Sequence, residues 1–144
     1  WRSVFAAKIG IADPETSDAT LIQDLLDLMA SERADFTRVF ALLGTKGARN
    51  EFVDRVGFDA WAARWAARKS PDAAQIMAKT NPQIIPRNHQ VEAVIQAGIA
   101  DDFAPFHALL AALTHPFASL SDDTGSFALA PSKSEQVTRT FCGT

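Results

Sequence analysis

The stretch ATLIQDLLDLMAS, residues 19–31, decides the fold class of this chain. Its large apolar residues recur at helical spacing and form one wide stripe; they are Leu21, Ile22, Leu25, Leu26, Leu28 and Met29. Ser17 or Asp18 provides the oxygen that caps the first turn. Helical spacing also dominates the rest of the chain, and no run of strict alternation is long enough for a strand. The sequence therefore predicts an all-α, compact multi-helix domain of about six to seven helices.

Two more helices are predicted in the first half of the chain. One runs from Phe36 to Leu43, with Asp35 as its capping residue and Gly44 just beyond its end. Together with the first helix it forms an αα-hairpin. The next helix begins near Asn50 after a polar connection, and Gly57 permits a bend in it.

Aromatic residues continue the helical spacing after this bend. They include Trp61 and Trp65, and Arg64 and Arg68 are placed to flank the two indoles. Paired tryptophans near arginines can bind a nucleotide base or a peptide. Aromatic residues at this spacing more often belong to a core, and we favour that interpretation.

A change from helix to extended chain is predicted in the middle of the sequence. Ser70-Pro71-Asp72 is typical of a helix start, and Pro82 ends that helix at Asn81. Ile84-Ile85-Pro86 fits neither a helix nor a turn, because two β-branched residues precede a proline. We expect Ile84 and Ile85 to be extended and buried, and to form a strap between helices.

Two helices follow the strap. The first runs from about Asn88, its cap, to Ala97 and stops at Gly98, and the second opens at Asp101 or Asp102. The residues expected to be buried are Val91, Val94 and Ile95 on the first helix, and Phe103, Phe106, Leu109, Leu110 and Leu113 on the second. Pro105 in the first turn of the second helix costs no hydrogen bond.

The end of the chain differs in composition from the helices. From Phe117 onward it is rich in Ser, Asp and Thr and has few apolar residues, which predicts an irregular arm. We therefore divide the chain into a helical domain, residues 1–117, and an irregular tail, residues 118–144. Trp1 is not an initiator methionine, so we expect a piece of a longer protein.

Charge and hydropathy exclude two classes of partner. The 17 acidic and 14 basic residues are interspersed, so no basic surface for nucleic acid is expected. No run of 18 apolar residues is present, and residues 1–10 do not form a signal sequence. We expect a cytoplasmic protein that binds neither nucleic acid nor membrane.

Residues for catalysis are scarce. Nucleotide transfer from ATP requires a phosphate-binding loop, a lysine and metal ligands, and no sequence signature of these is present. His89, His107 and His115 have no recognised metal-ligand spacing, and the acidic pairs at 101–102 and 122–123 are better explained as helix caps or surface groups. We predict no catalytic, cofactor-binding or metal-binding residue.

Cys142 is the one candidate for chemistry. It is the only cysteine, so no disulfide can form within these 144 residues. A thiol this close to the end of the sequence is unlike a core residue and is available for redox reactions or conjugation. An inert terminal cysteine is an equal alternative on sequence alone.

Several motifs resemble the C-terminal region of the SelO (YdiU) family of kinase-like protein adenylyltransferases. The most specific is the spacing of Asn81-Pro82 and Pro86-Arg87-Asn88 in NPQIIPRN. Others are LLDLMASERADFTRVFALL from Leu25, the Trp61 helix, His115-Pro116-Phe117 and the terminal Phe-Cys-Gly-Thr. The resemblance extends over nearly the whole chain.

The resemblance implies an enzyme larger than this chain. Family members have a kinase-like fold, bind ATP with a divalent metal, Mg²⁺ or Mn²⁺, and transfer AMP to hydroxyl groups of proteins. By position, Cys142 is similar to the redox cysteine that many members carry near the C-terminus. The family's catalytic and metal-binding residues lie upstream of Trp1, so none is assigned here.

Two hypotheses for function follow. The first is a non-catalytic helical domain that packs on the kinase-like core of the same polypeptide, with a structural and redox-regulatory role. The parent enzyme then acts on protein substrates. The alternative is a free-standing helical interaction module, without enzymatic activity, that uses Trp61 and Trp65 on an exposed face. Burial of the two indoles discriminates between them.

Overall fold

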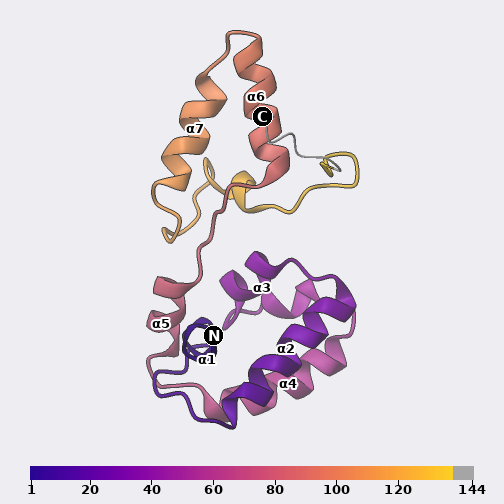
Figure 1. Ribbon diagram of the computed structural model, residues 1–144, viewed down its shortest axis with the longest axis vertical. Helices are drawn as coiled ribbons and strands as arrows, with labels where there is room; N and C mark the ends of the chain where they lie inside the picture. Colours follow the sequence, from indigo (N-terminus) through magenta and orange to yellow (C-terminus); the bar gives the residue numbers. More distant parts are fainter. Residues whose placement is uncertain (138–144) are drawn as a thin grey trace. The chain divides into compact units, whose positions relative to one another are not determined.

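The computed structural model describes residues 1–137, which are all-α as predicted. These residues form seven α-helices, two short 3₁₀-helices and no strand (Figure 1). The α-helices are α1 (Arg2–Lys8), α2 (Asp18–Glu32), α3 (Phe36–Leu42), α4 (Arg55–Arg68), α5 (Ala73–Thr80), α6 (Asn88–Ile99) and α7 (Ala104–Leu113), and the 3₁₀-helices are η1 (Ala48–Glu51) and η2 (Gly125–Ala128).

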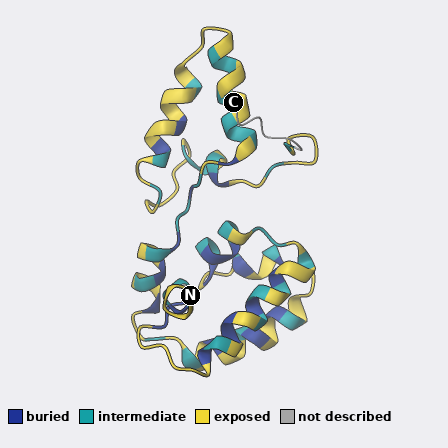
Figure 2. Cartoon of the chain, viewed as in Figure 1, coloured by how far each residue is buried: buried dark blue, intermediate teal, exposed yellow. Residues whose placement is uncertain are grey.

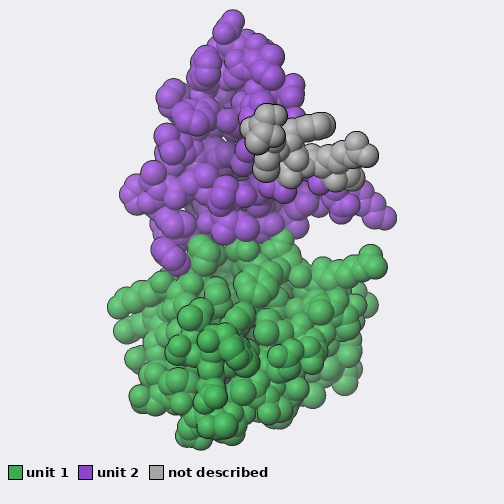
Figure 3. Space-filling view, in the orientation of Figure 1, with its two compact units in different colours: residues 1–82 green, residues 83–144 purple. Residues whose placement is uncertain are grey.

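The chain divides into two compact units, residues 1–82 and residues 83–144 (Figure 3). The boundary falls within the segment that joins α5 to α6. The boundary predicted between residues 117 and 118 divides the helices from the tail, which is a different division from that into compact units. It stays a prediction.

The first unit is built around an apolar core shared by α1 to α5. Helix α2 packs on α4, and α1 packs on both α2 and α5. The core includes the buried aromatic residues Phe40, Phe52, Phe58, Trp61 and Trp65. The rings of Phe52 and Phe58 stack with their centroids 4.8 Å apart. The helical periodicity in this half of the sequence therefore marks a true core.

Some helix ends in the first unit agree with the sequence and others differ. The Asp35 carboxylate accepts a hydrogen bond from the Arg38 N–H at 2.9 Å, which confirms the predicted cap. Gly44 follows α3 with φ +91°, the left-handed conformation expected after a helix end. The predicted helix start near Asn50 and bend at Gly57 are wrong. The Asp54 carboxylate caps α4 by accepting the Gly57 N–H at 2.9 Å, so Gly57 lies in the first turn.

The second unit contains an antiparallel helical pair, α6 and α7. Pro105 lies in the first turn of α7, as predicted. Helix α6 continues past Gly98 to Ile99, and Arg87 rather than Asn88 is its N-cap residue. Before the pair, residues 82–87 form no helix, and the N–H of Gln83 donates to the Pro116 carbonyl at 2.7 Å.

The predicted apolar faces of α6 and α7 are mostly not buried. No residue of α6 is buried, and Ile95, Phe103, Phe106 and Leu110 are exposed (Figure 2). Of the predicted set only Leu109 is buried. Two helices that pack on each other cover only one side of each, and the segment of residues 118–127 lies opposite only part of the remaining surface. This is why periodicity identified the helices but not their environment.

Beyond α7, the described residues to 137 contain only η2 as a regular element. Among residues 1–137 no helix is long and apolar enough to cross a membrane.

Candidate functional site

The motif NPQIIPRN contributes a buried amide to the first unit. Asn81, at the end of α5, is only 2% exposed. Its side-chain NH₂ donates to the carbonyls of Lys8 at 2.8 Å and Phe40 at 3.0 Å. The Asn81 amide thus joins the ends of α1, α3 and α5, which are far apart in sequence.

Lys8 contacts both the Asn81 side chain and an aromatic ring of the core. Its Nζ donates to the Asn81 side-chain carbonyl at 3.4 Å and lies 5.2 Å from the centroid of the Phe40 ring. Burial lowers the pKa of the Lys8 ammonium, because removal from water disfavours its charged form.

The other end of the motif lies in the second unit. Arg87 is buried, and its Nη2 donates to the carbonyl of Ala128 at 3.2 Å. Pro86 and Asn88 are exposed. These three residues line one side of a hollow of about 510 Å³, whose other side includes Glu135. Hydrogen bonds from the hydroxyl and N–H of Ser132 lower the pKa of that carboxyl. The motif residues are therefore not brought to one site: Asn81 orders the first unit and Arg87 the second.

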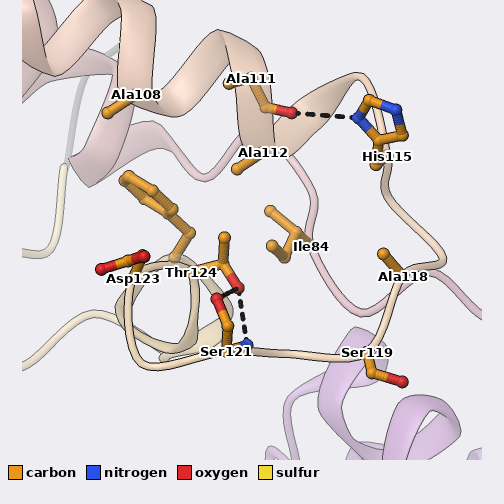
Figure 4. A pocket seen from close by; sticks show the side chains of 11 residues that line it. Ile84, Ala108, Ala111, Ala112, His115, Ala118, Ser119, Ser121, Asp123 and Thr124 are labelled. Carbon is orange, nitrogen blue, oxygen red and sulfur yellow. Dashed lines mark hydrogen bonds between the residues drawn. The ribbon is translucent and has the colours of Figure 1, made fainter.

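Ile84, the buried residue of the strap, forms the floor of a cavity of about 360 Å³ in the second unit (Figure 4). Alanines of α7 form one wall, and residues 118–127 form the other. His115 lies at the rim, where its Nδ1 is 3.5 Å from the Ala111 carbonyl. The Thr124 hydroxyl accepts the Ser121 N–H at 2.9 Å, so it is engaged within the wall.

The lining of this cavity suits a small apolar group rather than a reaction. It contains one histidine and one carboxylate, Asp123, and no cysteine or lysine. Within residues 1–137, no three His, Cys, Asp or Glu side chains come together to hold a metal ion.

The two tryptophans belong to the core of the first unit. Both are at least 94% buried, and their rings stack with centroids 5.6 Å apart. The Trp61 Nε1–H donates to the Leu21 carbonyl at 2.9 Å, and the Trp65 Nε1–H donates to the Ile9 carbonyl at 2.7 Å. The favoured interpretation from the sequence is confirmed, and the indoles are not available on an exposed face.

The arginines near these tryptophans make ion pairs instead of flanking the indoles. Arg64 pairs with Asp24 at 2.7 Å, and the cation over the Trp65 ring is Lys69 at 4.8 Å. Arg49, nearby, hydrogen-bonds Asp59 and holds the pKa of that carboxyl below its usual value. Arg64, Arg49 and Lys69 thus each have a partner within the protein.

Sequence reasoning missed a buried ion pair. Asp18, predicted only as a possible helix cap, is 2% exposed and accepts a hydrogen bond from Arg68 Nη2 at 2.8 Å, and its other oxygen lies 2.7 Å from Arg68 Nε in an ion pair. The same carboxylate accepts the Glu15 N–H at 2.7 Å. No helical spacing relates residues fifty positions apart, so only the fold reveals the pair.

The remaining candidates are dispersed. His107 and His115 make local contacts, with the Phe106 ring and with Thr114 and Ala111, and His89 contacts Gln90 and interacts electrostatically with Glu135. Cys142 lies outside the described residues.

Comparison with known proteins places the whole chain within longer relatives. A protein nucleotidyltransferase YdiU of Roseobacter denitrificans is 44% identical over 146 aligned residues, which cover all of this chain and 30% of that protein. Proteins of the same name from Ruegeria pomeroyi and Cereibacter sphaeroides are 42% and 44% identical and are each covered to 31%. The chain thus spans less than a third of these relatives. No protein-family model matches it.

Proposed function

Because this chain belongs to the YdiU family of protein nucleotidyltransferases, we propose that it is the helical C-terminal region of an enzyme that transfers AMP from ATP to hydroxyl groups of proteins. The acceptors are Ser, Thr or Tyr side chains of protein substrates, and pyrophosphate is the leaving group. The proposal includes a cytoplasmic location, in keeping with a chain that has one cysteine.

One observation carries the proposal: the similarity extends along all 144 residues, at 41–45% identity, to relatives about three times as long. The sequence signatures of nucleotide transfer are missing from these residues, so we assign the chemistry to the other part of the polypeptide. ATP and Mg²⁺ or Mn²⁺ are assigned to that part as well. The residues described here do not form a metal site, and we derive no step of the reaction from them.

This chain supplies structure in the proposed enzyme. Asn81 and Arg87, at the two ends of the motif, each donate to backbone carbonyls of distant segments. Such buried donors order a helical region without taking part in chemistry.

A regulatory role for Cys142 is part of the same proposal. Since no second cysteine is present in the chain, a disulfide would join Cys142 to a thiol elsewhere in the enzyme. Oxidation of the two thiols would transfer two electrons to a cellular disulfide such as oxidised glutathione.

The test compares the isolated 144-residue chain with the family-length polypeptide that contains it. We expect the long form to incorporate AMP from α-labelled ATP into protein, and the isolated chain to show no ATP binding by calorimetry with Mg²⁺ or Mn²⁺. Stoichiometric ATP binding by the isolated chain would overturn this division of roles. For the cysteine, Cys142→Ser should remove the difference in activity between oxidising and reducing conditions, and a difference that persists would exclude Cys142.

A further inference from the structure

The exposed apolar residues of the second unit gather on its helical pair. Five of them lie on α6, on α7 or in the connection between these helices, and we call them the hairpin patch: Ile95, Ile99, Phe103, Phe106 and Leu110. Ile99 is 74% exposed and Phe103 is 55% exposed. Figure 2 shows both helices largely exposed along their outer sides.

The spacing of these residues marks them as a face rather than as scattered exposures. Ile95 and Ile99 are four apart on α6, and Phe106 and Leu110 are four apart on α7, so each pair lies on one side of its helix. The Phe103 ring lies beside the end of α6, 3.7 Å from the position that a Cβ on Gly98 would occupy. Exposed apolar residues grouped on one helical pair in this way are typical of an interaction surface.

The charge of the same region is one-sided. Between Arg87 and Lys133 the sequence contains no lysine or arginine and five acidic residues, three of which flank the patch: Glu92, Asp101 and Asp102. Residues 83–144 have six acidic and three basic residues, and so account for the whole net charge of −3.

This charge decides between possible occupants. An acidic surface repels nucleic acid and anionic lipid headgroups. Two copies of the same acidic face would also repel each other. The favourable partner is an apolar protein surface that is bordered by lysine or arginine.

We infer that the hairpin patch docks on the part of the family-length polypeptide outside these 144 residues, through an apolar surface ringed by basic side chains. The inference rests on the proposed function. The relatives have more than twice this chain's length in additional sequence, and a surface on the same polypeptide has a high effective concentration. Docking buries the side of each helix that its partner helix leaves uncovered.

Hydrogen exchange on peptides from residues 88–113 tests the docking. We expect these amides to exchange at least about tenfold more slowly in the family-length protein than in the isolated chain. In the family-length protein, Phe103→Asp should raise their exchange to the level of the isolated chain. Leu129→Asp is the matched control, because Leu129 is equally exposed, at 54%, but lies outside the patch, and it should leave the exchange unchanged.

A charge variant tests the basic border without changing an apolar residue. Asp101→Lys should speed exchange of the same amides in the family-length protein, whereas Asp122→Lys, outside the hairpin patch, should not. Equal exchange in the two lengths of protein would overturn the inference. Protection already present in the isolated chain, through its own first unit or through dimerisation, would overturn it too.

AMP transfer measured on the same samples separates this inference from the proposed function. Transfer by a protein whose residues 88–113 are unprotected would refute the docking and leave the function standing. Protection of residues 88–113 in a protein that does not transfer AMP would refute the proposed function and leave the docking standing.

Discussion

Asn81 supports two backbone carbonyls that have no other side-chain donor among the described residues, those of Lys8 and Phe40. We expect Asn81→Ala to lower the free energy of unfolding of the first unit by about 1–3 kcal/mol, because both carbonyls stay buried without this donor. Urea unfolding followed by tryptophan fluorescence measures the loss, since all three tryptophans lie in residues 1–82.

Asn50→Ala is the matched control for this substitution. Asn50 is exposed in the same unit, and its replacement should change the free energy of unfolding by less than about 0.5 kcal/mol. Equal effects of the two substitutions would show that the Asn81 amide has no special role.

Arg68 and Arg64 provide a second comparison, because both lie on α4 and pair with an aspartate of α2. Arg68→Met leaves the Asp18 carboxylate buried without its cation and should cost about 3–5 kcal/mol. Arg64→Met breaks an exposed pair with Asp24 and should cost less than about 1 kcal/mol. Urea unfolding of the two variants measures both values, and a larger loss for Arg64→Met would contradict the assignment.

Lys8 predicts a pH dependence. Its pKa in the folded protein lies below the ordinary value of 10.5, so between these two values the unfolded chain binds more protons. The free energy of unfolding therefore rises with pH between these two values. Above them Lys8 is neutral in both states, and the cost of burying its charge is gone. We expect the wild type to gain free energy of unfolding relative to Lys8→Met as pH rises from neutral toward 10.5. Urea unfolding at several pH values measures this difference, and one that does not vary would exclude Lys8 as the source.

At the scale of elements, Gly10 controls how closely α1 approaches α5. Its φ is +71°, and a Cβ there would lie 2.5 Å from the Cβ of Ala73. Gly10→Ala therefore adds a steric clash to backbone strain and should lower the free energy of unfolding by more than about 1 kcal/mol.

Gly44→Ala separates the two effects. Gly44 also has a positive φ, +91°, but the nearest atom to its added Cβ is the flexible Met77 methyl at 3.1 Å. The loss measured by urea unfolding should be smaller than for Gly10→Ala. The reverse order would mean that the packing of α1 on α5 adjusts freely.

The sequence predicts these elements where the determinants are local. The α3 cap at Asp35, the glycine after α3 and the proline in α7 each depend on a few neighbouring residues, and all three are confirmed. The start of α4 was misplaced because Asn50 and Asp54 are both suitable caps, and packing selects the second. Burial along α6 and α7 depends on what lies against them, which periodicity does not contain.

At the scale of the whole molecule, the two units differ in how much apolar surface they bury. Of the 21 apolar residues that are buried within residues 1–137, 17 form the core of the first unit. The other four, Ile84, Leu109, Ala112 and Ala128, belong to the second. The sequence did not predict this division, because helical periodicity occurs in both halves. The ion pair of Asp18 and Arg68 and the donors of Asn81 likewise depend on long-range packing.

This imbalance predicts that residues 1–82 fold alone and residues 83–144 do not. The first fragment keeps its whole core, including both indoles and their hydrogen bonds, and should unfold cooperatively in urea with the tryptophan emission of buried indoles. The second fragment buries few side chains, too few to offset the loss of conformational entropy when two helices become ordered. It should therefore show no cooperative unfolding transition by circular dichroism. Cooperative unfolding of residues 83–144 alone would mean that the helical pair needs no further cover, and would remove the energetic reason for the hairpin patch to dock.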